Sequence, residues 1–247
     1  MRQDQTETPA GRGAAQARRG VWSILGLSLF GLLLFGATVV VTAPASIVAQ
    51  MIGLPPQVRS VSGSVWSGRA ALAGGTTLVW QGRARGFLRG ELAADLRLSG
   101  ARSLLDGVAF VGLGGMGLRD VTGRGGSDLL ALVPGAAACD GQANVDVARA
   151  AWGRSAVSAL GRIQVTESTC RGAGSADFKA PALDIALSEE GDAGVVTMAT
   201  RDAEATRMGQ ARLSPDGLLK LRVEPAAALL VPGLPTGGPT ELEFLLN

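Results

Sequence analysis

The sequence predicts a mainly β protein that carries a single N-terminal transmembrane helix. Two observations predict this. Residues 21–43 contain no charged side chain, and most of the chain after them shows short apolar runs of period two that are separated by glycine. The chain has 247 residues, of which 47% are hydrophobic and 18% are charged. Because this composition is too apolar for a disordered protein, we expect a folded β domain behind one membrane anchor.

The uncharged segment 21–43 is long enough, at about 1.5 Å per residue, to cross a hydrocarbon core of about 30 Å. Arg18 and Arg19 directly precede it, and the next charged residue is Arg59. Because basic residues favour the cytoplasmic side, we expect a cytoplasmic tail at residues 1–20 and the remaining chain on the far side. A cleaved signal peptide is the alternative, since residues 43–45 read Ala-Pro-Ala, although the apolar run exceeds the roughly 7 to 15 residues of a usual signal sequence.

Behind the anchor we expect a short stalk at residues 44–57 and a β-rich domain at residues 58–247. The stalk is uncharged and contains the break Pro55-Pro56. In the domain, apolar runs or alternation predict strands at residues 64–68, 77–81, 91–98, 108–111, 116–122, 142–147, 161–165, 183–188, 195–200, 209–213 and 218–223.

Turn signals join these strands into antiparallel hairpins. Gly74-Gly75 suits a tight hairpin turn because both positions accept a positive φ, and residues 214–217, Ser-Pro-Asp-Gly, are typical of a turn. Short helical turns are expected at residues 127–133 and 225–230. Arginines at 83, 85, 89 and 97 suggest a sheet with one wet side. We therefore expect one curved antiparallel sheet or an open sandwich.

The two cysteines, Cys139 and Cys170, both follow the predicted span and are 31 residues apart. An even pair in an oxidising compartment is most simply a structural disulfide, which would stabilise the fold by roughly 3 to 4 kcal/mol on the chain-entropy model. A redox-active pair would favour the spacing Cys-x-x-Cys, and a metal site would need more than two soft ligands.

The composition argues against most enzyme chemistry and against nucleic-acid binding. Histidine and tyrosine are both absent, which removes Ser-His-Asp and Cys-His catalysis and histidine-ligated metals. The chain after residue 20 has no net charge, whereas a nucleic-acid-binding protein needs a basic stripe with aromatic side chains beside it. We therefore predict no enzyme activity, no cofactor, no metal and no nucleic-acid partner.

Two local motifs could suggest a ligand site. Residues 112–117 match the dinucleotide pattern GxGxxG, but the residues after them are too β-like to form the helix that would hold a pyrophosphate. We interpret this motif as a glycine-rich connection between strands. Glu189, Glu190 and Asp192 surround Gly191, which is more typical of a solvated turn than of a metal or glycosidase site.

A tryptophan-rich hairpin is the most distinctive feature of the domain. Residues 63–68 read Gly-Ser-Val-Trp-Ser-Gly, and Trp80 lies on the next predicted strand. Across a hairpin closed by Gly74-Gly75, Trp66 and Trp80 would project on the same side of the sheet. They would then either bury each other in the core or form a docking surface together with Gly68.

This motif, behind an uncharged anchor and a proline-containing stalk, resembles the N component of the bacterial type II (general) secretion pathway. The two later cysteines and the segment Pro232-Gly233-Leu234-Pro235 also fit that family. The resemblance implies an inner-membrane protein with one span, a small cytoplasmic end and a β-rich periplasmic domain. It implies a non-enzymatic accessory component that docks onto other secretion components, by strand addition or by sheet stacking.

A second function remains open from the residues alone. A long curved sheet with an apolar concave face, tethered to the inner membrane, would suit a protein that holds the acyl chains of lipids. This alternative rests on analogy between folds, and a continuous apolar groove would favour it.

Overall fold

The computed structural model of the protein describes residues 27–32, 34–36, 38, 42, 44–46, 53–83, 86, 90–133, 138–171, 177–229 and 237–246. The chain separates into two compact units, Met1–Ala43 and Pro44–Asn247. The described residues of the first unit are helical, and Thr38 and Thr42 donate their hydroxyls to the carbonyls of Leu34 and Thr38. Within the described part of the chain, no helix has the length and apolar character to span a bilayer. Much of the predicted span 21–43 lies outside the described residues.

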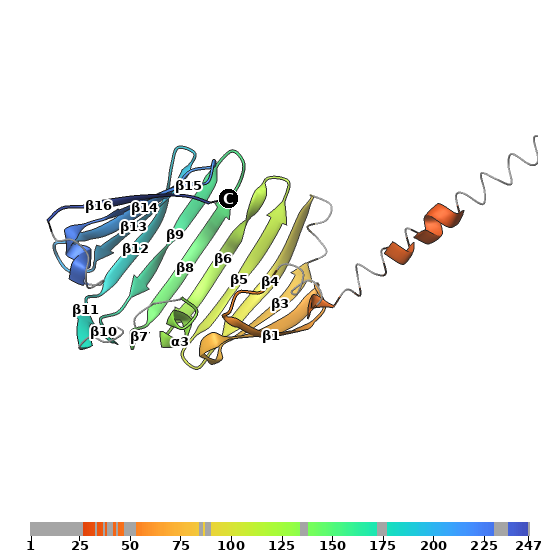
Figure 1. Ribbon diagram of the computed structural model, residues 1–247, viewed down its shortest axis with the longest axis horizontal. Coiled ribbons are helices and arrows are strands. Elements are labelled where there is room, and N and C mark those ends of the chain that lie inside the picture. Colours follow the sequence, from red (N-terminus) through yellow and green to blue (C-terminus); the bar gives the residue numbers. More distant parts are fainter. Residues whose placement is uncertain are drawn as a thin grey trace, which may run out of the picture. The chain divides into compact units, whose positions relative to one another are not determined.

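The second unit is built on a large antiparallel sheet, confirming a mainly β fold with one continuous layer of strands (Figure 1). Its thirteen described strands follow the order of the sequence and are β1 (Val58–Gly63), β2 (Ser67–Leu72), β3 (Thr77–Arg83), β4 (Glu91–Ser99), β5 (Leu104–Gly112), β6 (Gly115–Gly125), β8 (Ala143–Trp152), β9 (Val157–Val165), β12 (Leu183–Glu190), β13 (Ala193–Thr200), β14 (Arg207–Leu213), β15 (Leu218–Val223) and β16 (Thr240–Leu245).

A small second sheet and short helical segments complete the described part of this unit, and three of these segments have both bounds within the described residues. The small sheet has the strand order β11 (Asp177–Ala180), β10 (Ser168–Arg171) and β7 (Ala138–Cys139). The three helical segments are η1 (Ala73–Gly75), α3 (Ser127–Leu130) and η3 (Pro225–Leu229). The helical turns predicted near residues 127 and 225 are therefore confirmed. Gly74 and Gly75 have φ values of 71° and 74°, as expected for the turn between β2 and β3.

The strand predicted at residues 64–68 is wrong in its first half. Ser64 to Trp66 form the turn between β1 and β2, and β2 begins at Ser67. Gly63 has a positive φ of 97°, and the backbone N–H of Ser67 donates to the Ser64 hydroxyl at 3.1 Å. A serine side chain that bonds nearby backbone in this way competes with the strand ladder, and alternation alone does not reveal it.

Strand pairing divides the side chains between two faces. One cross-strand row on the first face pairs Leu118 with Ala109 and Ala150, and Ala150 with Ala159. We call this the apolar face, and by the same register it includes Leu78, Trp80, Leu96, Val111, Met116, Trp152, Val157, Ile163, Ile185, Val196, Leu221, Leu242 and Phe244. The other side, the charged face, carries nearly all the arginines and acids of the strands.

Two bulges, in the adjacent strands β6 and β8, occur without disturbing the division of side chains between the two faces. In β6, Arg119 pairs with Val108 whereas Thr122 pairs with Asp106, so that the intervening Asp120 is bulged with a φ of 53°. In β8, the register shifts between Val147 and Arg149. A bulge bends its strand and increases the local twist. The two bulges therefore bend the middle of the sheet without moving apolar side chains to the charged face.

The sheet curves around its apolar face. The indole Nε1 of Trp152, on β8, donates to the carbonyl of Pro215 at 3.2 Å. Pro215 lies in the turn between β14 and β15, and β9, β12 and β13 separate β8 from β14 in the sheet. Strands lie about 4.8 Å apart, so an indole on a flat sheet would not reach this turn. The apolar face is therefore concave, and η3 packs on it where Ala227 joins Leu183 and Met208 in a buried cluster.

The predicted disulfide is present and lies in the small sheet. Cys139 on β7 and Cys170 on β10 are directly opposite each other in the register and are joined through their sulfurs. Cys170 is buried. The bond therefore links two connections that lie outside the main sheet, the one that follows α3 and the one between β9 and β12.

Asp128 of α3 ties together two connections at one end of the strands, the one between β4 and β5 and the one between β6 and β8. Its carboxylate accepts hydrogen bonds from the hydroxyl of buried Ser103 and from the backbone N–H of Arg102, and the Ser103 hydroxyl accepts from Gly126 N–H. A Cβ atom on Gly100 would collide with the same carboxylate. Burial opposes ionisation, but the bonds from Ser103 and from backbone N–H groups outweigh it and hold the pKa of Asp128 below its ordinary value.

We predict that Asp128→Asn lowers the free energy of unfolding by about 1 to 3 kcal/mol at pH 7, because the amide places donors against the donors of Ser103 and Arg102. The native pKa lies below the unfolded value of about 3.9, so the carboxylate stabilises the fold above that pH and ceases to do so as pH falls through the native pKa. Urea unfolding at pH 7 and near pH 3 measures this.

Asp192→Asn is the matched control, since Asp192 is exposed in the turn between β12 and β13. The difference between wild type and Asp128→Asn should shrink at low pH, while the control should match wild type at both values. An equal effect of Asp128→Asn at the two pH values would contradict the role of the ionised carboxylate.

Candidate docking surfaces

In the tryptophan hairpin, at the β1 end of the sheet, an indole ring packs over a glycine of the neighbouring strand. Trp80 lies directly opposite Gly68, and a Cβ atom on Gly68 would collide with its indole. The Trp80 Nε1 donates to the carbonyls of Ser64 and Val65 at 3.2 and 3.1 Å. The ring therefore lies over Gly68 and closes the turn between β1 and β2.

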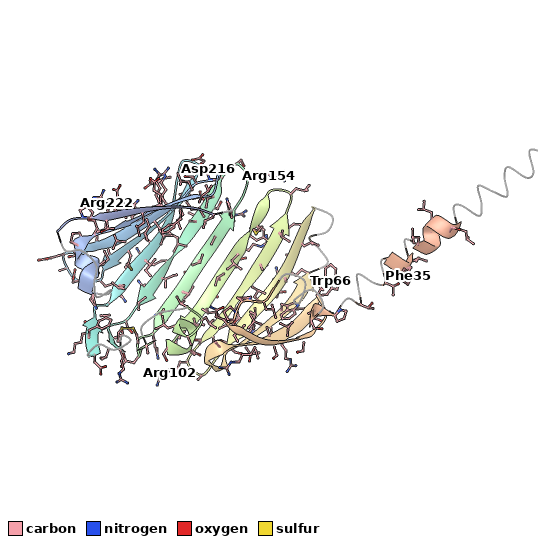
Figure 2. The ribbon with its side chains drawn as sticks, viewed as in Figure 1. Phe35, Trp66, Arg102, Arg154, Asp216 and Arg222 are labelled. Atoms are coloured by element: carbon pink, nitrogen blue, oxygen red, sulfur yellow. A yellow bond between two sulfur atoms is a disulfide. The ribbon has the colours of Figure 1, made fainter. Side chains whose placement is uncertain are left out.

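Trp66 uses a second glycine in the same manner. A Cβ atom on Gly82 would lie 3.1 Å from Cε3 of Trp66, and the Gly82 N–H donates to the Trp66 carbonyl. Trp66 and Trp80 are both only partly buried. The glycines in this motif thus provide space for the rings, and each ring leaves one surface available to solvent or to a partner. Figure 2 shows Trp66 at the β1 end of the sheet.

The two edges of the main sheet differ in how well they are protected. At β1 the register is irregular between Val58 and Ser60, and Arg59 is exposed. A bulge in an edge strand discourages pairing with another strand. At the other edge, β16 pairs with β15 in a regular register, and Leu242, Phe244 and Leu245 are exposed. The β16 edge is therefore the better template for an added strand.

The direction of the backbone groups in β16 follows from one hydrogen bond. The N–H of Leu246 donates to the Gly217 carbonyl at 2.9 Å, in continuation of the pairing between β16 and β15. In an antiparallel strand the backbone groups of alternate residues point to opposite sides. The N–H and C=O groups of Glu241, Glu243 and Leu245 consequently point away from β15, towards the open edge.

The charged face is a ladder of ion pairs. Arg83 Nε donates to Asp95 at 2.8 Å, and this bond lowers the pKa of Asp95 and raises that of Arg83. Further cross-strand pairs are Arg97–Asp106, Arg119–Glu91, Arg162–Asp184, Arg212–Glu190, Lys220–Glu243 and Arg222–Glu241. Arg85 and Arg89 lie outside the described residues. These pairs are largely solvated and contribute little stability individually.

A small apolar cluster interrupts the charged face. Phe110 is buried together with Ala93 and Val108, and the guanidinium carbons of Arg119 and Arg149 each lie 5.1 Å from its ring centroid. Cations over an aromatic face are attracted by its quadrupole. The two arginines therefore cover the one apolar cluster identified among the described residues of this face.

The remaining sequence motifs are connections between strands. Gly112 and Gly115 are the flanking residues of the turn between β5 and β6, and a strand rather than a helix follows, so this motif does not form a dinucleotide loop. Gly191 has a φ of 67° in the turn between β12 and β13, and Glu190 pairs with Arg212 at 2.7 Å. In the described part of the chain, no cluster of three or more His, Cys, Asp or Glu residues is arranged to hold a metal ion.

A cavity of about 430 Å³ lies at one end of the apolar face. Val111, Met116, Trp152 and Pro215 line it, and Arg154 lies at its rim. The charged face carries a groove of about 520 Å³ whose lining includes the paired side chains Arg83, Asp95, Arg97 and Asp106. No sequence motif indicates the cavity on the apolar face, because only the curvature of the sheet brings the turn at Pro215 to Val111, Met116 and Trp152.

Comparison with known proteins supports the resemblance drawn from the hairpin motif. The family model for protein N of the type II secretion system matches residues 56–234. Curated proteins and solved structures give no significant match. The family match covers well over half of the chain, including the tryptophan hairpin, the disulfide and most of the main sheet. The chain therefore belongs to the type II secretion system protein N family.

Proposed function

We propose that this type II secretion component is a non-enzymatic accessory protein whose β domain docks onto other components through the open edge of β16. The observation that carries the proposal is the unprotected edge itself. Glu241, Glu243 and Leu245 present backbone donors and acceptors outward, and no bulge interrupts the strand. An extended segment of a partner would satisfy these groups by strand addition.

The side chains of β16 would add specificity to such a strand. Leu242 and Phe244 extend the apolar face to the edge, while Glu241 and Glu243 extend the charged face. A partner strand with alternating apolar and basic residues would continue both surfaces, because cross-strand neighbours interact most closely on each face. The ion-pair ladder supports a non-enzymatic role. Its acidic and basic side chains pair with one another and do not converge on one position where a substrate could react.

We further propose that residues 21–43 anchor the protein in the inner membrane, with residues 1–20 cytoplasmic and the β domain periplasmic. Arg18 and Arg19 before the uncharged segment support this orientation. The disulfide between Cys139 and Cys170 supports an oxidising compartment for the β domain.

The continuous apolar concave face favours the lipid-handling role as a second candidate function. Exposed Leu92, Val111, Met116 and Leu118 lie on this face, although soluble proteins rarely leave a large contiguous apolar surface uncovered. A membrane-tethered protein with such a surface is suited to hold acyl chains. This role and docking through β16 use different parts of the sheet and are compatible.

We predict that Glu243→Pro abolishes secretion of a type II substrate when the variant replaces the wild-type chain. Proline removes an N–H that points to the open edge and leaves the bonds between β16 and β15 intact. Glu243→Ala is the control, because it loses the same ion pair with Lys220 but keeps the N–H. Secreted substrate in the medium and thermal melting of the purified variants are measured. Normal secretion with folded Glu243→Pro would rule out docking at this edge.

For the tryptophan hairpin we predict that Trp80→Ala lowers the free energy of unfolding by about 1 to 3 kcal/mol, below the roughly 3 to 5 kcal/mol of a fully buried aromatic ring, since Trp80 is half-buried. Trp80→Phe should lose less, because it keeps a ring over Gly68 and removes only the indole donor. Chemical unfolding of both variants measures this. If Trp80→Ala is as stable as wild type but does not support secretion, the hairpin is a docking surface instead of a structural corner.

For the orientation we predict that alkaline phosphatase fused after Asn247 is active in cells, because that enzyme needs the oxidising periplasm to form its disulfides. The mature protein should also retain residues 21–43. Inactive fusion protein, or a mature N-terminus beginning near residue 46, would contradict the proposed anchor.

A further inference from the structure

The cavity at the end of the apolar face is formed by one cross-strand row and one distant turn. Val111, Met116 and Trp152 are consecutive partners across β5, β6 and β8, and Pro215 approaches from the turn between β14 and β15. The hydrogen bond from Trp152 Nε1 to the Pro215 carbonyl holds this turn in place. Its volume of about 430 Å³ lies within the range of small-molecule sites, and the named lining side chains other than Arg154 are apolar.

The entrance to this cavity is unusually apolar for a solvent-exposed turn. Leu113, at the tip of the turn between β5 and β6, is 91% exposed, and Met116 is 57% exposed. Leu92 and Leu118 extend the exposed apolar surface along the same face. Contiguous exposed side chains of this kind mark a contact with another apolar phase.

A single cation stands at the rim. Arg154 lies exposed in the turn between β8 and β9, and within the described residues it makes no ion pair. By contrast, the arginines of the ion-pair ladder each face a carboxylate. Asp216, on the neighbouring turn, accepts from the backbone N–H of Leu218 at 3.3 Å. Figure 2 shows Arg154 and Asp216 along the same margin of the sheet. Arg154 is thus available to an anionic group beside an apolar cavity.

The chain enters the β domain at this same end of the strands. Pro44 forms an isolated β-bridge with Ser64, in the turn between β1 and β2. Because the main sheet is antiparallel and follows the sequence, the β1–β2, β5–β6, β8–β9 and β14–β15 turns all lie at one end. The uncharged segment 21–43 directly precedes Pro44 in the sequence.

From these observations we propose that the cavity binds one acyl chain of an anionic phospholipid drawn from the membrane, with Arg154 contacting the phosphate of its head group. The acyl chain lies against Val111, Met116 and Trp152, and Leu113 marks the entrance. The proposal rests on the lipid-handling role and assigns it a site and a lipid class.

Photocrosslinking of the full chain in lipid nanodiscs tests the proposal. The probe is phosphatidylglycerol with a diazirine on one acyl chain, and mass spectrometry locates the label in the β domain. We expect label on Val111, Met116 or Trp152. Met116→Gln should reduce it by about tenfold, because a polar group replaces part of the apolar contact. Leu160→Gln, a similarly exposed side chain on the charged face, should not.

Arg154→Gln tests the head-group contact. With wild type, diazirine phosphatidylglycerol should label the cavity about threefold more than phosphatidylcholine with the same chains, and Arg154→Gln should remove this difference. Melting temperatures of all variants check that they are folded. Equal labelling by the two lipids in the wild type would overturn the assignment to an anionic lipid.

The position of the label separates this proposal from the broader function. Label on the apolar face near Met198 but not in the cavity would overturn the site and leave lipid handling in place. Label on Leu113 alone would show that the turn only touches the membrane surface, and would overturn the site as well. Absence of label from the entire β domain would overturn both.

Discussion

The structure depends on a strict alternation of side chains that stays in register across thirteen antiparallel strands. A shift of one residue in any strand would exchange its apolar and charged sides, so the bulges at Asp120 and near Ala148 are as important as the regular pairs. They bend the sheet while both faces remain continuous. The result is a single layer of strands with a concave apolar face and a second face on which acidic and basic side chains form ion pairs across the strands.

A single-layer sheet of this kind lacks a conventional two-sided core, and its stability is spread over many half-buried contacts. Local devices compensate at the corners. Trp80 covers Gly68, Trp152 holds the distant turn at Pro215, Asp128 ties α3 to Ser103, and η3 covers the apolar face at Ala227. Each of these contacts holds a turn or a short helix at a margin of the sheet. The edge at β16 and the cavity beside Trp152 remain open, and these are the two places where the proposed functions act.

Local signals predicted much of the fold, because period-two alternation and turn chemistry are short-range properties. The Gly74-Gly75 turn and the helical turn at Ser127 are accessible in this way. The pairing of Cys139 with Cys170 is predictable for another reason, because the chain has only two cysteines and both follow the predicted span. The strand predicted from Ser64 is wrong in its first part, because the Ser64 hydroxyl bonds the backbone of the turn. The strand at β16 was missed, although its alternation of glutamate with Leu242 and Phe244 is visible in the sequence.

The candidate sites required long-range information. The contact between Trp152 and Pro215 spans 63 residues and arises from the summed bend of the intervening strands, which no local pattern encodes. The exposure of the β16 edge likewise follows from strand order. The resemblance of residues 63–68 to the secretion family did identify the family, but it did not indicate which surface is used.

The most direct test of the account is residue-resolved hydrogen exchange of the β16 amides. In the isolated full-length protein, Leu242 and Phe244 should be protected by their bonds to β15, while Glu241, Glu243 and Leu245 should exchange rapidly. In the assembled secretion system the outward amides should become protected as well. Rapid exchange of these amides in the assembly, equal to that in the isolated protein, would contradict docking through the open edge.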